Sequence, residues 1–248
     1  MKELTTDDIE ICMTEDNSST IIHKDLQVSY RSIHGAKTES DWVFIQNSKI
    51  FDTSPSQPDC KRVVELGFGM GSNFRSCAEK AMALHIPLHY ISIEHQPIPP
   101  SIITENDMVA TMIRTVLEQA RNKQTISRIE YQNTTLELHC RDIFDPELDI
   151  PHQADAFFHD PFGPLANPQA WTPECFAIIA TLCAPTAILS TYGAAGHARR
   201  AMAQAGFYVA SVPGLGKKRE ITIASKSSER ITHGKLCTKY LPLRPSNT

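Results

Sequence analysis

The chain has 248 residues, 41% of them hydrophobic and 21% charged, an ordinary composition for a globular protein with one large core. No apolar run approaches the roughly 20 residues of a membrane span, and the acidic, polar N-terminus is unlike a signal peptide. The seven cysteines are scattered without a C-x-x-C pair, which is typical of reduced thiols and not of a disulfide framework or a zinc site. These features predict a cytoplasmic protein.

Charge is distributed unevenly along the chain. The net charge is -4, but residues 217–248 carry eight Lys/Arg and two Glu, which leaves the remainder at -10. Such asymmetry is typical of a basic face that binds a polyanion. A solvated tail that aids solubility explains the same counts equally well.

The first 52 residues are predicted to form a small β-rich extension. Short alternating or β-branched runs indicate strands at residues 20–23, 27–30 and 42–45. A loop with two prolines, residues 53–59, then separates this extension from a main domain over residues 59–248. We therefore expect two units of unequal size.

Predicted strands and helices alternate through the main domain. The strands are residues 62–66, 88–93, 136–140, 154–159, 187–191, 207–212 and 220–225, and the helices between them are 74–85, 107–122, 173–183 and 196–205. Alternation of this kind predicts a mostly parallel sheet covered on both faces, and the last two strands are predicted to pair as an antiparallel hairpin. Seven strands with such an ending match the α/β, Rossmann-like sheet of class I S-adenosylmethionine-dependent methyltransferases.

A glycine-rich turn joins the first of these strands to its helix. Glu65 is followed by Gly67, Gly69 and Gly71, and glycines at a helix start let a ligand approach the backbone amides closely. A dinucleotide fingerprint requires glycine at position 72, where this chain has Ser72. Because the acidic Glu65 can pair with a ligand's ammonium group, the pattern favours S-adenosylmethionine over NAD or FAD. The alternative is a purely structural strand-to-helix turn.

Four acidic residues lie at the ends of neighbouring predicted strands: Glu65, Glu94, Asp142 and Asp160. Ligands of a doubly wound sheet bind beyond the carboxyl ends of its strands, so we expect these acids at one site. Glu94 is placed to accept from both ribose hydroxyls, Asp142 to accept from the adenine amino group, and Asp160 to lie beside the transferred methyl group. A single acid at a strand end is more often a helix cap or turn former, but four along one edge favour a functional site.

The segment Asp160-Pro161-Phe162 resembles the D/N-P-P-F/Y loop of methyltransferases that act on amino nitrogens. An amine reacts only through its free lone pair, so a carboxylate that orients the amine and receives its proton suits the chemistry. No metal site is expected, because Pro87 breaks any helix that would pair His85 with His89.

Several motifs, in order, resemble the family of aminomethyluridine methyltransferases, which complete 5-methylaminomethyl-2-thiouridine in tRNA, either alone or fused to an FAD-dependent oxidoreductase. The motifs are YRS (30–32), ESDWVFI (39–45), ELGFG (65–69), FHDPFGP (158–164), NP (167–168), WTPECF (171–176), STY (190–192), AG (195–196), RR (199–200), AGF (205–207) and GLGKKRE (214–220). The resemblance covers about residues 25–225.

The resemblance implies N-methylation of 5-aminomethyl(-2-thio)uridine at the tRNA wobble position, with S-adenosyl-L-methionine as cofactor and residues 59–248 as the methyltransferase domain. By motif match, the cofactor would be held by Glu65, Gly67, Gly69, Asn73, Glu94 and Asp142, with Tyr30 and Phe162 closing the pocket. Asp160 would lie at the reaction centre. The basic residues Lys217, Lys218 and Arg219 would contact tRNA phosphates, or else form a solvated turn.

The sequence departs from the family's pattern at Gly163, where alanine or serine is expected, and at His95, where lysine often follows the ribose acid. The oxidoreductase half of the fused enzymes is absent, so we expect a separate protein to supply the aminomethyl substrate. Two alternatives are a methyltransferase of another amine, small molecule or protein, and a binding module without turnover. The four acids at the strand ends argue against the second.

Overall fold

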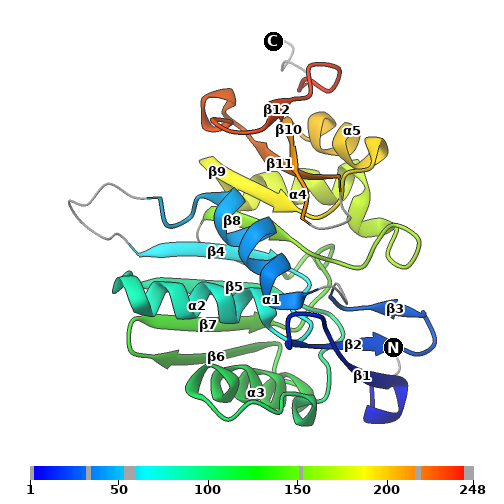
Figure 1. Ribbon diagram of the computed structural model, residues 1–248, viewed down its shortest axis with the longest axis vertical. Helices are drawn as coiled ribbons and strands as arrows, with labels where there is room; N and C mark the ends of the chain where they lie inside the picture. Colours follow the sequence, from blue (N-terminus) through cyan, green and yellow to red (C-terminus); the bar gives the residue numbers. More distant parts are fainter. Residues whose placement is uncertain (1–2, 32–34, 53–59, 151–152, 216–218, 243–248) are drawn as a thin grey trace.

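A nine-stranded sheet forms the centre of the protein in the computed structural model, which describes residues 3–31, 35–52, 60–150, 153–215 and 219–242 (Figure 1). In spatial order the strands are β12 (Lys235–Leu236), β10 (Tyr208–Pro213), β11 (Glu220–Ser225), β9 (Cys183–Thr191), β8 (Ala154–His159), β4 (Lys61–Leu66), β5 (Leu88–Ile93), β7 (Thr134–His139) and β6 (Ile126–Tyr131). The five strands from β9 to β7 are parallel, and the strands at both edges are antiparallel.

Helices cover both faces of this sheet. They are α2 (Ser72–Leu84), α3 (Met108–Arg121), α4 (Pro173–Leu182) and α5 (Gly196–Gln204). Elsewhere the described chain forms the single turns η1 (Thr6–Asp8), η3 (Pro100–Ile102), η4 (Gln169–Trp171) and η5 (Ser228–Arg230). Side chains alternate along β4, so Val63 packs with Phe74 of α2 and Val64 packs in the opposite core with Phe176 of α4. Both valines are fully buried, as expected for a central parallel strand.

The predicted α/β fold class is confirmed, and all seven predicted strands of the main domain are present. The last two form the predicted antiparallel hairpin, in which Tyr208 is opposite Ser225. Two further strands, β6 and β12, extend the sheet at its edges and were not predicted. Residues 126–131 are mostly exposed or half-buried, so they lack the apolar pattern that identifies a central strand.

The N-terminal segment contains a three-stranded antiparallel sheet of β1 (Ile9–Met13), β2 (Ser19–His23) and β3 (Val28–Ser29). The prediction of a strand at residues 42–45 is wrong. Those residues lie in a helical stretch in which α1 (Ala36–Glu39) continues into the π-helical turn η2 (Ser40–Gln46). Val43 and Phe44 are buried there against the sheet, so a run of apolar residues that reads as a strand is in fact the inner face of a helix.

The order in which the chain adds strands to the sheet reverses at β4, and this reversal positions the ligand site. The chain moves outward from β4 to β5 and β7, then returns to place β8 on the other side of β4. The strands on either side of such a switch leave a crevice beyond their carboxyl ends. In register, Leu66 of β4 is opposite Ile93 of β5 and His159 of β8, so the residues that follow all three strands emerge together. Among the described helices, none has the length and apolar character needed to cross a bilayer.

Candidate active site

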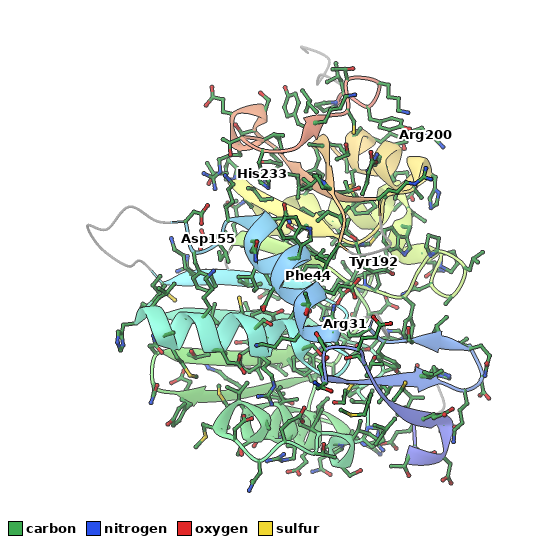
Figure 2. All side chains as sticks on the ribbon, in the orientation of Figure 1. Arg31, Phe44, Asp155, Tyr192, Arg200 and His233 are labelled. Carbon is green, nitrogen blue, oxygen red and sulfur yellow. The ribbon has the colours of Figure 1, made fainter. Side chains whose placement is uncertain are left out.

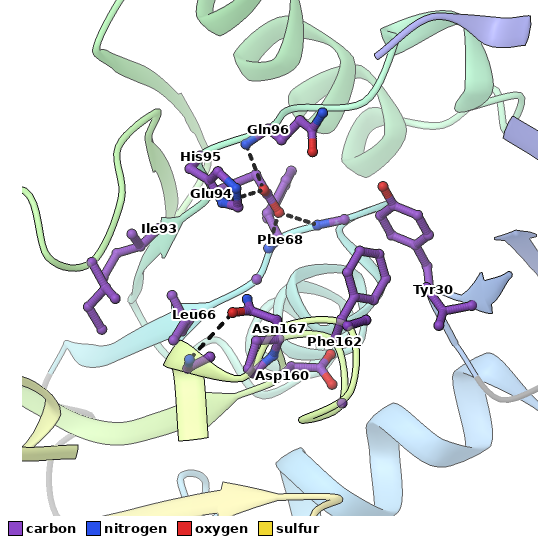
Figure 3. Close-up of a pocket in the computed structure, with 18 of the residues that line it drawn as sticks. Tyr30, Leu66, Phe68, Ile93, Glu94, His95, Gln96, Asp160, Phe162 and Asn167 are labelled. Atoms are coloured by element: carbon purple, nitrogen blue, oxygen red, sulfur yellow. Dashed lines mark hydrogen bonds and ion pairs between the residues drawn. The ribbon is translucent and has the colours of Figure 1, made fainter. Parts of the chain in front are cut away.

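A cavity of about 970 Å³ opens at this edge of the sheet (Figure 3). Its volume is at the upper end of the range for small-molecule sites, which leaves room for a nucleoside cofactor and a second group. Seven of the residues predicted to hold the cofactor or to lie at the reaction centre line it: Tyr30, Gly67, Gly69, Glu94, Asp142, Asp160 and Phe162. Residues 26–31, from the turn between β2 and β3 onward, form one of its walls, of which the sequence predicted Tyr30 alone.

The glycine loop needs glycine at two positions, where φ is positive and a Cβ would be crowded. Gly67 has φ +93°, and a Cβ there would lie 2.7 Å from the backbone carbonyl oxygen of Asp160. Gly69 has φ +50°, and a Cβ there would lie 3.0 Å from the Tyr30 ring. The loop is therefore packed between the segment after β8 and the N-terminal segment, in a backbone conformation that favours glycine.

Glu94 binds the glycine loop through its carboxylate. Its Oε2 accepts from the backbone N–H groups of Phe68 (3.1 Å) and Gly69 (3.3 Å), and its Oε1 accepts from Gln96 N–H (2.9 Å) (Figure 3). These bonds fix the carboxylate at the cavity wall. Asp142 is fixed in a similar way, because its Oδ1 accepts from Phe144 N–H at 2.9 Å. Both acids therefore line the cavity with carboxylate oxygens bound to backbone N–H groups, both oxygens in Glu94 and Oδ1 in Asp142.

Glu65 and Asn73 are not among the described residues that line the cavity. Glu65 is fully buried beneath the glycine loop, where it accepts from Asn73 Nδ2 (2.8 Å) and Ser92 Oγ (2.9 Å). Burial raises the pKa of Glu65 to about 8, and the nearby charge of Asp160 contributes in the same direction. At neutral pH most of this carboxyl is therefore protonated.

Asp160 forms the polar centre of the cavity wall. Its Oδ2 lies 2.6 Å from Arg31 Nη1 and accepts from Asn73 Nδ2 at 2.9 Å. The Asn73 amide therefore joins the carboxyl groups of Glu65 and Asp160. Arg31 was missed in the sequence, although it is adjacent to Tyr30. An isolated arginine in a loop gives no pattern that separates a buried partner from an exposed one.

Side chains from three elements hold the segment that follows Asp160. The Tyr192 hydroxyl donates to the Pro161 carbonyl at 2.7 Å, and Trp171 Nε1 donates to the Phe162 carbonyl at 2.8 Å. His159 is buried against Trp171 and bonds the Ala170 carbonyl through Nε2, and burial lowers its pKa to about 4. The indole and the phenol thus fix the backbone on which Phe162 sits, and the neutral imidazole of His159 packs against that indole.

The aromatic ring of Phe162 meets that of Tyr30 edge to face, with ring centroids 4.7 Å apart. Two segments more than 100 residues apart in sequence thereby close one side of the cavity. Such a pair suits a flat, conjugated ligand such as a nucleobase.

The predicted basic face is only partly described. Lys217 and Lys218 lie outside the described residues, and Arg219 is exposed and does not line the cavity. Two other basic side chains of this region bind backbone: Lys226 Nζ donates to the Ala180 and Cys183 carbonyls at 3.0 and 2.6 Å, and Arg230 Nε donates to Thr186. Within the described ranges, no group of three His, Cys, Asp or Glu side chains is arranged to hold a metal ion.

The strand order, the glycine loop after the central strand and the carboxylates at the ends of the next strands define a class I methyltransferase. Residues 104–227, half of the chain, match the sequence profile of a family described as S-adenosyl-L-methionine-dependent methyltransferases. The chain belongs to this family.

Curated proteins with similar sequences show which methyltransferases the chain resembles. The tRNA 5-methylaminomethyl-2-thiouridine biosynthesis bifunctional protein MnmC of Stutzerimonas stutzeri (strain A1501) is 34% identical over 207 residues, which are 77% of this chain and 31% of that protein. The corresponding protein of Hahella chejuensis is 29% identical over 81% of this chain and 34% of its own length. The chain thus spans about a third of the length of these curated relatives.

Solved structures agree with this fold. The crystal structure of MnmC2 from Aquifex aeolicus is 26% identical and superposes with a TM-score of 0.72, over 88% of this chain and 70% of that one. Spermidine synthase from Thermotoga maritima superposes with a TM-score of 0.55 at 13% identity, over 90% of this chain and 70% of that one, and shares the fold alone.

Proposed function

We propose that the protein transfers a methyl group from S-adenosyl-L-methionine to the amine of 5-aminomethyl(-2-thio)uridine at the tRNA wobble position, giving 5-methylaminomethyl(-2-thio)uridine. One observation carries the proposal: a buried carboxylate, Asp160, lies in a cavity wall next to the Tyr30–Phe162 aromatic pair. A carboxylate binds an amine, and an aromatic wall binds a base, so the site suits an aminated nucleoside. The names of the curated relatives point to the same nucleoside.

The cavity residues fit S-adenosyl-L-methionine. Glu94 would accept from the ribose hydroxyls and Asp142 from the adenine amino group, because both carboxylates line the cavity and carboxylates accept hydrogen bonds from such donors. Gly67 and Gly69 line the cavity, so their backbone would contact the ligand. Glu65 and Asn73 support the loop and Asp160 from below, and a direct contact of Glu65 with the ligand's ammonium group stays a prediction.

The bound cofactor supplies an activated methyl group on a sulfonium sulfur, so the protein has mainly to place the amine. Asp160 would accept a hydrogen bond from the amine and direct its lone pair. Tyr30 and Phe162 would hold the base. The backbone on which Phe162 sits is bound by Trp171 and Tyr192, which keeps the carboxylate and the aromatic pair in one arrangement.

Other parts of the proposal concern the surroundings of the site. Lys217, Lys218 and Arg219 would contact tRNA phosphates, which fixes orientation without reading sequence. A separate oxidoreductase would supply the aminomethyl group. The reaction would take place in the cytoplasm, where tRNA is modified. Residues 1–52 would act as an extension that completes the pocket of the 59–248 methyltransferase domain, since residues 26–31 line the cavity.

Methyl transfer to tRNA from a strain that lacks this modification tests the proposal. With labelled S-adenosylmethionine, we expect label in that tRNA and none in tRNA that already carries the methyl group. Asp160→Asn should bind cofactor normally and transfer methyl at least about 100-fold more slowly. Asp155→Asn is the matched control, because Asp155 lies at the opposite end of the same strand and its carboxylate accepts only a backbone bond from Arg62 among those described.

Cofactor binding without label in either tRNA would contradict the tRNA assignment. Label in a small amine or a protein under the same conditions would then identify the substrate class. Full activity of Asp160→Asn would remove Asp160 from its assigned role.

A further inference from the structure

Arg31 is a buried cation in the wall of the cavity. Its side chain is 5% exposed, and its Nη1 lies 2.6 Å from Asp160 Oδ2. The guanidinium also lies 5.6 Å from the centre of the Phe44 ring, and the Arg31 backbone N–H donates to Thr20 Oγ1 at 3.0 Å. Figure 2 places Arg31 and Phe44 together in the middle of the molecule. Backbone and side chain are therefore both held, so the charge has a fixed position.

Acidic and phenolic groups from several elements surround this charge. Burial lowers the pKa of Arg31, but the charges of Asp160, Glu39 and Glu65 outweigh burial, and the pKa is raised. Of the three carboxyls, Glu65 is mostly protonated at neutral pH because its pKa is about 8. The phenols of Tyr90 and Tyr192 face the same groups, and burial raises the pKa of both, so they are neutral. Arg31 is thus the cation that offsets Asp160 among the described groups facing it.

We propose that Arg31 is a positioning residue for methyl transfer: it holds Asp160 as an ionised hydrogen-bond acceptor, so that Asp160 orients the substrate amine and does not take its proton. The inference rests on the proposed amine methylation. An arginine in contact with a carboxylate strongly favours the ionised form, and a carboxylate held in that form is a weak base. The sequence alone suggested that Asp160 serves both roles.

The reaction balances without a protein base. The amine enters in its neutral form, after its ammonium proton has gone to water. Its lone pair forms the new nitrogen–carbon bond while the electrons of the carbon–sulfur bond return to sulfur. The resulting secondary ammonium ion releases its proton to water or leaves charged. Asp160 keeps its bond to Arg31 throughout and guides the direction of attack.

The hydrogen bond from Asn73 makes it possible to separate the effect of a donor on Asp160 from the effect of a positive charge. Its amide donates to the same Asp160 oxygen at 2.9 Å but carries no charge. If a donor alone were sufficient, Asn73 would hold Asp160 in place after the removal of Arg31. If the cation is required, removal of Arg31 changes how Asp160 responds to pH.

The test compares three substitutions at Arg31 with one matched control. Arg31→Lys keeps the charge, Arg31→Met removes it, and Arg31→Gln keeps a donor without charge. Arg199→Met is the control, because Arg199 is also buried (8% exposed) and bonds a carboxylate, Glu220, at 2.9 Å. Arg199 lies on α5, beside Arg200, which Figure 2 labels well away from Arg31.

The rate of transfer to aminomethyluridine tRNA is measured against pH, together with cofactor affinity. For Arg31→Met and Arg31→Gln we expect kcat/KM at neutral pH to fall about 100-fold, since a misplaced orienting group has effects of that size. The acidic limb of the pH profile reports the protonation of the amine and, at lower pH, of Asp160. Its lower break should move to higher pH by at least about one unit, because the carboxylate no longer has its cation. Arg31→Lys should restore most of the rate and the wild-type profile, with cofactor affinity unchanged in all three.

Arg199→Met should lower thermal stability and leave the pH profile as in the wild type. In an Asp160→Asn background, Arg31→Met should cause no further decrease in rate, because Arg31 acts through Asp160. A wild-type pH profile in folded Arg31→Gln, or a full further decrease in rate in the Asp160→Asn background, overturns the inference about Arg31 and leaves the proposed function unaffected. Absence of transfer by the wild-type protein overturns the proposed function, and this inference with it.

Discussion

The pH dependence of folding stability tests the conclusion that Glu65 is a buried acid and mostly protonated at neutral pH. The carboxyl is fully buried and accepts from Asn73 and Ser92, and its pKa is raised to about 8 in the folded protein, chiefly by burial. The ordinary pKa of a glutamate side chain is 4.5. Between these two pH values the folded state binds more protons at this site than the unfolded state. Stability therefore decreases as pH rises from about 4.5 to about 8.

The size of this decrease in stability follows from the linkage between proton binding and folding. Each pH unit in this interval changes the free energy of unfolding by about 1.4 kcal/mol, so the decrease between pH 5 and pH 7 is on the order of 3 kcal/mol. Glu65→Gln is close in shape to the protonated acid and can keep both partners, since the Ser92 hydroxyl can accept from the new amide. We therefore expect the variant to gain on the order of 3 kcal/mol relative to the wild type over this interval.

Urea unfolding of both proteins at pH 5, 6, 7 and 8 measures the difference directly, because groups that titrate in both proteins cancel. Glu118→Gln, on the exposed side of α3, is the control and should show no pH-dependent difference. A constant difference between Glu65→Gln and the wild type across this range would refute the account of Glu65 as a mostly neutral, buried acid.

Two further predictions concern the glycine loop and the basic residues. Gly67→Ala should destabilise the fold by about 1–3 kcal/mol and abolish cofactor binding, because its Cβ would lie 2.7 Å from the Asp160 carbonyl. Gly206 has the same φ of +93° but open space where a Cβ would lie, so Gly206→Ala should lower stability and leave cofactor binding unchanged. Calorimetry measures cofactor binding by both variants, and equal binding would contradict the role of the loop. Reversal of charge at Lys217, Lys218 and Arg219 should weaken tRNA binding regardless of sequence and reduce the salt slope by about 1 for each phosphate that is no longer bound, and an unchanged slope would refute this basic interaction.

The strand ends could be predicted from the sequence because a parallel sheet places them by simple rules. Glu94, Asp142 and Asp160 each follow a recognisable apolar strand, and strands that run in parallel bring their carboxyl ends to one edge. The glycine spacing after β4 is a local signal of the same kind. These features need only short stretches of sequence and the topology of a doubly wound sheet.

The rest depends on contacts between distant segments. Four consecutive residues at 42–45, all apolar, have no period that separates a strand from a buried helix, and packing against the sheet decides for the helix. Arg31 meets Asp160 across more than 120 residues of sequence, and Tyr30 meets Phe162 in the same way. The position of Glu65 beneath the loop depends on Asn73 and Ser92, which lie on two other elements. No local pattern contains this information.

Nucleoside mass analysis of the methylated tRNA tests the central claim most directly. The purified protein is incubated with labelled S-adenosylmethionine and tRNA that carries 5-aminomethyluridine, and the tRNA is digested to nucleosides. We predict that the label is found on 5-methylaminomethyl(-2-thio)uridine from the wobble position. Label on any other nucleoside, or unlabelled tRNA despite cofactor binding, would contradict the account.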